Sequence, residues 1–167
     1  DMIQSTGAPA AIGPYSQAVD TGSTVYLSGQ IGQDPASGQI VTGFKAQTIQ
    51  ALENLKAVLA AAGMTLDNMA QVDVFVTDMR NFEDFNAIYS TYFPAYKPAR
   101  LFVEVRGLCP GAEVEIRGIA CRRCPRRHET GLSGNGSAQL RFPDRLFLPS
   151  LWAGTGGSMD FGPVLAY

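Results

Sequence analysis

Arg100 and Glu115 are the residues best suited to chemistry, and they lie on two successive predicted strands. A guanidinium stays charged at any working pH and can bind a carboxylate through two parallel hydrogen bonds, so Arg100 suits an acidic metabolite. A carboxylate such as Glu115 can orient a water molecule or accept a proton from it. Most arginines on strands are only solvated or salt-bridged, so this pair indicates a site only where other features support it.

Hydrophobic periodicity predicts the elements that must position this pair. Alternating or β-branched stretches locate four strands, and apolar residues spaced three and four apart, among them Leu52, Leu55, Leu59 and Ala62, predict two helices. Gly63 is expected to end the first helix, which runs for about five turns, and Pro94 the second. We expect strands at 24–28, 71–77, 100–105 and 113–120, and helices at 44–62 and 82–93.

The second helix carries its own start signal and its own apolar face. Asn81 is a possible N-cap, with Asp84 three residues later in a position like that of a capping box. An aromatic stripe is expected to face the core, and it consists of Phe82, Phe85, Tyr89 and Tyr92.

With one further strand before the first helix, for which the pattern gives no bounds, the element order β, β, α, β, α, β, β predicts an α+β fold with two helices on one face of a mixed sheet. The connection at 106–112 would suit a hairpin between the last two strands. Alternation places Arg100, Phe102 and Glu104 on one side of their strand, and it places Glu115 and Arg117 opposite Val114 and Ile116. A sheet covered on one face usually hides the other in an oligomer, so we expect one here.

Five motifs resemble the YjgF/RidA family of imine and enamine deaminases, in the same order and at nearly the same spacing, from about residue 3 to residue 122. They are Ala8-Pro-Ala-Ala-Ile-Gly-Pro-Tyr15-Ser-Gln, Leu27-Ser-Gly-Gln-Ile31, Phe85-Asn-Ala-Ile-Tyr89, Pro98-Ala-Arg100 and Val114-Glu-Ile116. The resemblance implies a chorismate-mutase-like (YjgF-like) subunit and a homotrimer with a central β-barrel. Each substrate cleft would then lie between subunits.

The resemblance also implies roles for individual residues. Arg100 matches the arginine that binds the substrate carboxylate, and Glu115 matches the glutamate that positions or activates the hydrolytic water. Five further residues match those that line the cleft: Tyr15, Ser28, Gly29, Asn86 and Phe102. Two positions depart from the family pattern. Phe102 replaces a frequent cysteine, although its main-chain carbonyl can serve equally well, and Arg117 replaces a more usual acidic residue.

The implied activity is hydrolysis of 2-iminobutanoate and 2-iminopropanoate to 2-keto acids and ammonia, without a cofactor. Pyridoxal-phosphate-dependent dehydratases would supply these imino acids. Two alternatives stay open. One is a non-catalytic trimer that binds small carboxylates, for which Glu115 would be unnecessary. The other is an RNA-acting, translation-inhibiting or chaperone-like role, which would need a basic groove.

The composition is typical of one globular domain and does not favour nucleic acid as a partner. The 167 residues are 46% hydrophobic and 17% charged, with a net charge of −2, so neither disorder nor nucleic-acid binding is expected. We expect a cytoplasmic protein, because three cysteines are few for a secreted scaffold and the sequence shows no basic or apolar leader. We also expect no membrane segment, because the longest apolar run, 57–62, is too short to cross a bilayer.

The last part of the chain differs in character from the rest. We assign residues 1–122 to the deaminase-like domain and 123–167 to a C-terminal tail of low order, because about 45 residues rarely fold alone. Cys121, Cys124 and His128 have the spacing of half a zinc site, but a second pair of ligands is missing from the sequence. We therefore expect no metal. The arginines at 122, 123, 126 and 127 are expected to be solvated rather than to bind RNA.

Overall fold

The computed structural model describes residues 1–123, and the predictions for residues 124–167, including those for Cys124 and His128, lie outside the described residues. None of the described helices combines the length and the apolar character that a membrane crossing requires. The elements in chain order are β1 (Met2–Ile3), β2 (Ala18–Asp20), β3 (Thr24–Ile31), α1 (Phe44–Ala61), η1 (Leu66–Asn68), β4 (Met69–Val76), η2 (Met79–Asn81), α2 (Phe82–Tyr92), β5 (Ala99–Glu104) and β6 (Val114–Cys121).

The strands form a single mixed sheet in the order β1-β2-β3-β6-β4-β5. β4 and β5 are parallel, and the other neighbours are antiparallel. The predicted mixed sheet is therefore confirmed. The predicted hairpin between β5 and β6 is wrong, because β4 lies between these two strands and pairs with both.

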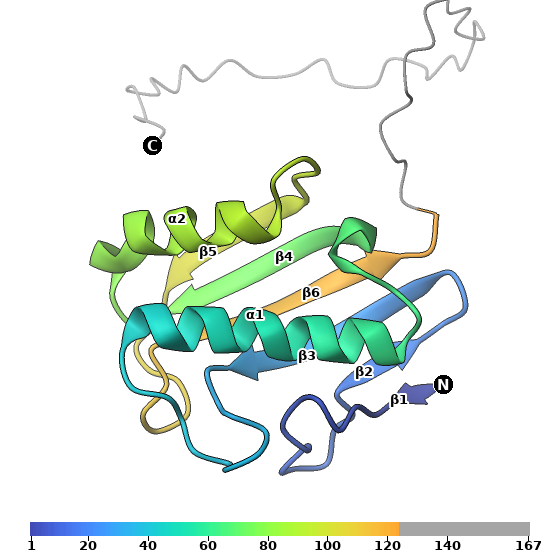
Figure 1. The fold of residues 1–167 in the computed structure, drawn as a ribbon, viewed down its shortest axis with the longest axis horizontal. Helices are drawn as coiled ribbons and strands as arrows, with labels where there is room; N and C mark the ends of the chain where they lie inside the picture. The colour runs from blue at the N-terminus through green and yellow to red at the C-terminus, as the bar shows by residue number, and fades with distance from the viewer. Residues whose placement is uncertain (124–167) are drawn as a thin grey trace, which may run out of the picture. The chain divides into compact units, whose positions relative to one another are not determined.

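Both helices lie on the same face of the sheet, as predicted (Figure 1). α1 lies over β3 and β6, and α2 contacts β5 through Phe85 and Phe102, whose ring centroids are 5.1 Å apart. The core between helices and sheet contains Leu52, Leu55 and Leu59 of α1, which confirms the predicted helical stripe. Burial of these side chains supplies most of the stability of such a layered fold.

The opposite face of the sheet carries a mixture of apolar and charged side chains. Tyr26 is 51% exposed and Leu101 is 47% exposed on this face. Between them in the sheet, Arg117 donates from Nε to Asp73 Oδ2 at 3.0 Å, and Asp73 is almost fully buried. Arg117 thus has an acidic partner on the next strand.

The helix ends agree only in part with the signals in the sequence. Gly63 has a positive φ of 69° directly after the C-cap of α1, as expected for a glycine that ends a helix. Asn81 is the N-cap of α2, but its side chain makes no capping hydrogen bond, and Asp84 instead pairs with Lys45 at 3.1 Å. The predicted capping box is therefore absent from α2.

Two short strands precede β3, and the sequence pattern gave bounds for neither of them. β1 and β2 are two and three residues long and form the edge of the sheet beside β3. Asp20 ends β2, and its carboxylate accepts hydrogen bonds from Gly22 N and Arg122 Nη2. Strands this short contain no full period of alternation, which explains why the pattern did not locate them.

Candidate functional site

Glu115 lies on β6 and points to the face of the sheet that the helices leave uncovered. Its neighbours Val114 and Ile116 are fully buried under the helices, so alternation along the strand confirms the predicted orientation. A small cavity of about 140 Å³ opens beside its carboxylate. Tyr15, Gly29 and Cys109 line this cavity together with Glu115. These four residues are called the glutamate half-site below.

Gly29 brings its backbone against the Glu115 carboxylate. A Cβ atom added to Gly29 would lie 1.8 Å from Glu115 Oε1 and 2.7 Å from its Cδ, so no other residue type fits without moving the carboxylate. The pairing of β3 with β6 is irregular between Leu27 and Gln30, which allows this close approach. The carboxylate can occupy this position because residue 29 has no side chain.

The loop before β2 holds Tyr15 beside the cavity. Ser28 Oγ donates to the Ser16 carbonyl at 2.6 Å, and the Ser28 amide donates to the Gln17 carbonyl at 2.9 Å. Ser28 therefore acts on the loop here, and it is not among the residues that line the small cavity.

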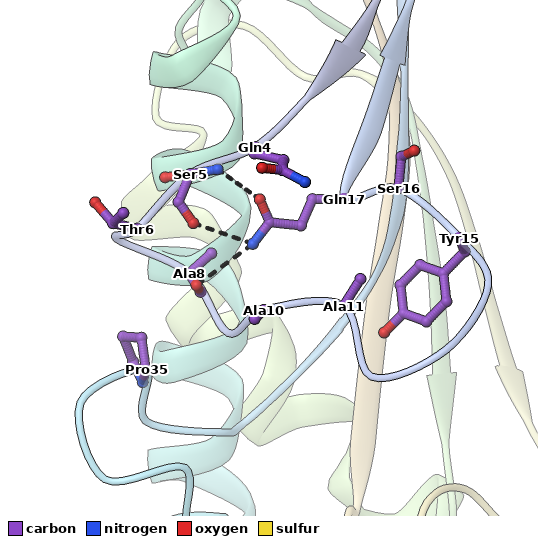
Figure 2. Close-up of a pocket in the computed structure, with 10 residues that line it drawn as sticks. All are labelled: Gln4, Ser5, Thr6, Ala8, Ala10, Ala11, Tyr15, Ser16, Gln17 and Pro35. Carbon is purple, nitrogen blue, oxygen red and sulfur yellow. Dashed lines mark hydrogen bonds between the residues drawn. The ribbon is translucent and has the colours of Figure 1, made fainter.

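The buried side chain of Gln17 anchors the preceding segment. Its amide oxygen accepts from Ser5 N at 2.6 Å, and its amide nitrogen donates to the carbonyls of Ser5 and Ala8 (Figure 2). A second cavity of about 630 Å³ lies beside these bonds, and Tyr15 lines both cavities. Tyr15 therefore lies on a loop that is held in position by Ser28 of β3 and by the buried amide of Gln17.

Arg100 lies on β5 and points toward α2. Its guanidinium carbon is 4.9 Å from the centroid of the Tyr89 ring and 5.7–5.9 Å from three other rings, those of Phe82, Phe85 and Phe102. Attraction between a cation and aromatic ring faces holds the group there. Arg100 is exposed and has no ion-pair partner among residues 1–123. These five residues are called the arginine half-site below.

Two other predicted residues, Phe102 and Asn86, lie in the same region of the subunit. Phe102 packs edge-on against Phe82 at 5.0 Å, so its ring is part of the support beneath Arg100. Asn86 is half-buried on α2, three residues before Tyr89 and four after Phe82, which places it on the same side of the helix. The structure therefore brings Arg100, Asn86 and Phe102 together in one region of the subunit.

The two half-sites lie on opposite faces of the sheet. Arg100 is in register with Val72, and Val72 is in register with Gly118 on β6. Glu115 is three residues from Gly118, so its side chain points the other way. The prediction that Arg100 and Glu115 lie on neighbouring strands, a hairpin apart, is therefore wrong, because β4 separates the two strands and the side chains of one subunit do not converge.

Sequence reasoning missed several members of the two half-sites. The aromatic stripe of α2 was predicted as core, yet Phe82 is 36% exposed, and its ring faces Arg100. Cys109 entered the sequence analysis only as one of three cysteines, whereas in the structure it lines the cavity together with Glu115. In the described part of the chain, no three His, Cys, Asp or Glu side chains gather as metal ligands would.

Comparisons with known proteins identify the family. The model of the Endoribonuclease L-PSP family matches residues 5–122. A 2-iminobutanoate/2-iminopropanoate deaminase of Mus musculus is 48% identical over 120 residues, which are 71% of this chain and 89% of that protein.

Solved structures agree with the sequence matches. The crystal structure of the YjgF gene product from E. coli has a TM-score of 0.72 at 41% identity and covers 74% of this chain and 99% of that one. That of E. coli TdcF with bound serine has a TM-score of 0.71 at 39% identity and covers 73% and 98%. The chain therefore belongs to the Endoribonuclease L-PSP family, the YjgF/RidA family that its motifs resemble.

Proposed function

We propose that this protein hydrolyses 2-imino acids and their enamine tautomers, such as 2-iminobutanoate and 2-iminopropanoate, to 2-keto acids and ammonia. The observation that carries the proposal is the exposed guanidinium of Arg100, which four aromatic rings surround and which has no ion-pair partner among residues 1–123. The same chain also places the carboxylate of Glu115 at a small cavity. The name of the mouse relative supports this substrate class. Serine, which TdcF binds, carries an α-carboxylate as a 2-imino acid does.

The complete site would be assembled between subunits of a homotrimer. Arg100 lies on β5, the last strand of the sheet, and therefore near the perimeter of the subunit. Glu115 points away from the face on which its neighbours Val114 and Ile116 are buried, and another subunit can pack on that uncovered face. A neighbour whose edge meets that face would bring its own Arg100 to Glu115, and three such contacts would close a ring around a barrel of uncovered sheet faces.

The reaction then needs binding, orientation and one proton acceptor. Arg100 of one subunit binds the substrate carboxylate through two charge-assisted hydrogen bonds. Glu115 of the next subunit orients a water molecule toward C2 and accepts its proton as the oxygen attacks. The electrons of the C=N bond move to nitrogen and a carbinolamine forms. The nitrogen takes up this first proton, Glu115 then passes the proton of the carbinolamine hydroxyl to the nitrogen, the C–N bond breaks as the C=O bond forms, and ammonia leaves.

The remaining predicted residues shape the cleft in this scheme. Tyr15 and Gly29 border the water beside Glu115, while Asn86 and the main-chain carbonyl of Phe102 lie on the arginine side. Ser28 contributes by holding the loop that carries Tyr15. All of these steps use side chains and backbone of the chain, and the substrate would come from a pyridoxal-phosphate-dependent dehydratase in the same compartment, which we place in the cytoplasm.

A coupled assay tests the proposal. A threonine dehydratase generates 2-iminobutanoate, semicarbazide competes for the imine, and the rate of 2-oxobutanoate formation is followed. We expect the protein to raise this rate, and we expect Arg100→Ala and Glu115→Gln to abolish the increase. Arg80→Ala and Glu83→Gln change the same residue types at exposed positions outside both half-sites and should keep it.

The outcomes separate the proposal from its alternatives. An unchanged rate with the wild-type protein would exclude the deaminase function. An unchanged rate together with 2-oxobutanoate binding that depends on Arg100 would instead support a non-catalytic trimer that binds small carboxylates. Circular dichroism of each variant shows whether a loss of activity reflects a loss of fold.

A further inference from the structure

Tyr89 is a buried tyrosine whose hydroxyl has no hydrogen-bond partner among the described residues. The side chain is only 8% exposed, and its hydroxyl oxygen is buried. The ring is stacked between those of Phe85, at 5.4 Å, and Phe93, at 4.5 Å. The ring is thus packed on both sides, while its polar end is unsatisfied.

An unsatisfied buried hydroxyl is costly to a folded protein. Taking such a group out of water without a partner destabilises the fold, and most buried polar atoms therefore have one. Phenylalanine would fill the same space without this cost. The other tyrosine near the end of α2 shows the usual solution, because Tyr92 donates from its hydroxyl to Glu53 Oε1 at 2.8 Å.

The ring that carries this hydroxyl belongs to the arginine half-site. The guanidinium carbon of Arg100 lies 4.9 Å from the centroid of the Tyr89 ring, closer than to any of the three phenylalanine rings around it. Arg100 is the exposed member of this contact, so it can shift as a ligand arrives. Burial raises the pKa of Tyr89 to about 12, although the charge of Arg100 opposes this, so the hydroxyl keeps its proton at neutral pH.

We propose that Tyr89 is a further substrate-binding residue, whose hydroxyl donates a hydrogen bond to the carboxylate that Arg100 holds. This inference rests on the proposed function, because it takes the ligand to be the carboxylate of a 2-imino or 2-keto acid. The guanidinium supplies the charge and two donors, and the phenol supplies a neutral donor from beneath. Binding of the ligand then satisfies a group that is unsatisfied in the free protein.

The inference predicts opposite effects of one substitution on stability and on binding. Tyr89→Phe removes the unsatisfied hydroxyl, so the midpoint of thermal unfolding should stay the same or rise. The same change removes a donor to a charged acceptor, so the dissociation constant of 2-oxobutanoate, measured by calorimetry, should increase about tenfold.

Tyr92→Phe is the matched control, because it removes a hydroxyl from the same helix that is already bonded to Glu53. It should leave the affinity for 2-oxobutanoate unchanged. Unchanged affinity in Tyr89→Phe, with binding lost in Arg100→Ala, would overturn this inference and leave the proposed function standing. A fall of several degrees in the unfolding midpoint of Tyr89→Phe would show a structural partner and overturn it as well. Wild-type protein that does not bind 2-oxobutanoate would overturn both.

Discussion

The glutamate half-site and the arginine half-site position their charged groups by opposite means. The Glu115 carboxylate occupies the space that a side chain at residue 29 would fill, and Gly29 leaves this space free. The Arg100 guanidinium is instead held by neighbouring groups, since the centroids of four aromatic rings lie within 6 Å of its central carbon. The first half-site should therefore respond most to added atoms, and the second to changes in the chemistry of the cation or of its rings.

The largest effect is expected from one added methyl group in the glutamate half-site. Gly29→Ala would place Cβ where Glu115 Oε1 now lies, so the carboxylate must leave its position. Because a flexible side chain moves rather than the backbone, the protein should still fold. Deaminase activity should fall about 10²-fold to 10⁴-fold, as for loss of a general base, in the coupled assay.

Gly107→Ala is the control for this substitution, because a Cβ at Gly107 meets no atom within 4 Å. It should retain full activity. If Gly29→Ala stayed as active as Gly107→Ala, the Glu115 carboxylate would not need the position that it occupies here.

A bulky group attached to Cys109 should also block the glutamate half-site. The thiol is exposed and lines the same cavity of about 140 Å³ as Glu115, so a maleimide adduct would fill the space needed by water and substrate. Activity should fall by most of its initial value as labelling of Cys109, followed by mass spectrometry, approaches completion. Cys109→Ser should be active and should resist the reagent, whereas full labelling with retained activity would place the reaction elsewhere.

A smaller effect is expected from changing the cation in the arginine half-site. Arg100→Lys keeps the charge but loses the planar fork and the stacking on the aromatic rings. We expect KM for the imino acid to rise about tenfold with little change in kcat, because the lost contacts are made equally by substrate and transition state. Arg80→Lys, at an exposed ion pair with Asp78, should change neither constant. A fall in kcat alone would show that Arg100 acts on the reacting atoms.

The smallest effect concerns stability at alkaline pH. Burial raises the pKa of Tyr89 to about 12, above its usual value near 10 in an unfolded chain. The protonated phenol therefore contributes stability that is fully present below pH 10 and is lost as the pH rises toward 12. The urea midpoint of wild type should decline from pH 9 to pH 11 more than that of Tyr89→Phe, at equal subunit concentration. Parallel declines would show that the phenol ionises equally in the folded and unfolded chain.

Local patterns in the sequence predicted the elements well. The spacing of Leu52, Leu55 and Leu59 predicted α1, and alternation around Val114 and Ile116 predicted both β6 and the direction of Glu115. These features depend on residues a few positions apart, for which periodicity is a direct physical signal. The motifs also predicted the family that the comparisons identified.

Features that depend on distant pairing could not be predicted in this way. The insertion of β4 between β5 and β6 depends on which strands meet, and the connection at 105–113 does not encode it. The contact of Gly29 with Glu115 requires the irregular pairing of β3 with β6. The stripe on α2 was visible in the sequence, but its role around Arg100 required the position of β5 beneath it.

Subunit mixing tests the central claim most directly, since one charged group from each of two subunits must form the site. Arg100→Ala and Glu115→Gln proteins are each inactive alone, and they are unfolded together in equal amounts and refolded. Each site needs Arg100 from one subunit and Glu115 from the next. When the two variants assemble at random, about one site in four combines both intact groups, so about a quarter of wild-type activity should return. Activity no higher than that of the two separately refolded variants would contradict a shared site.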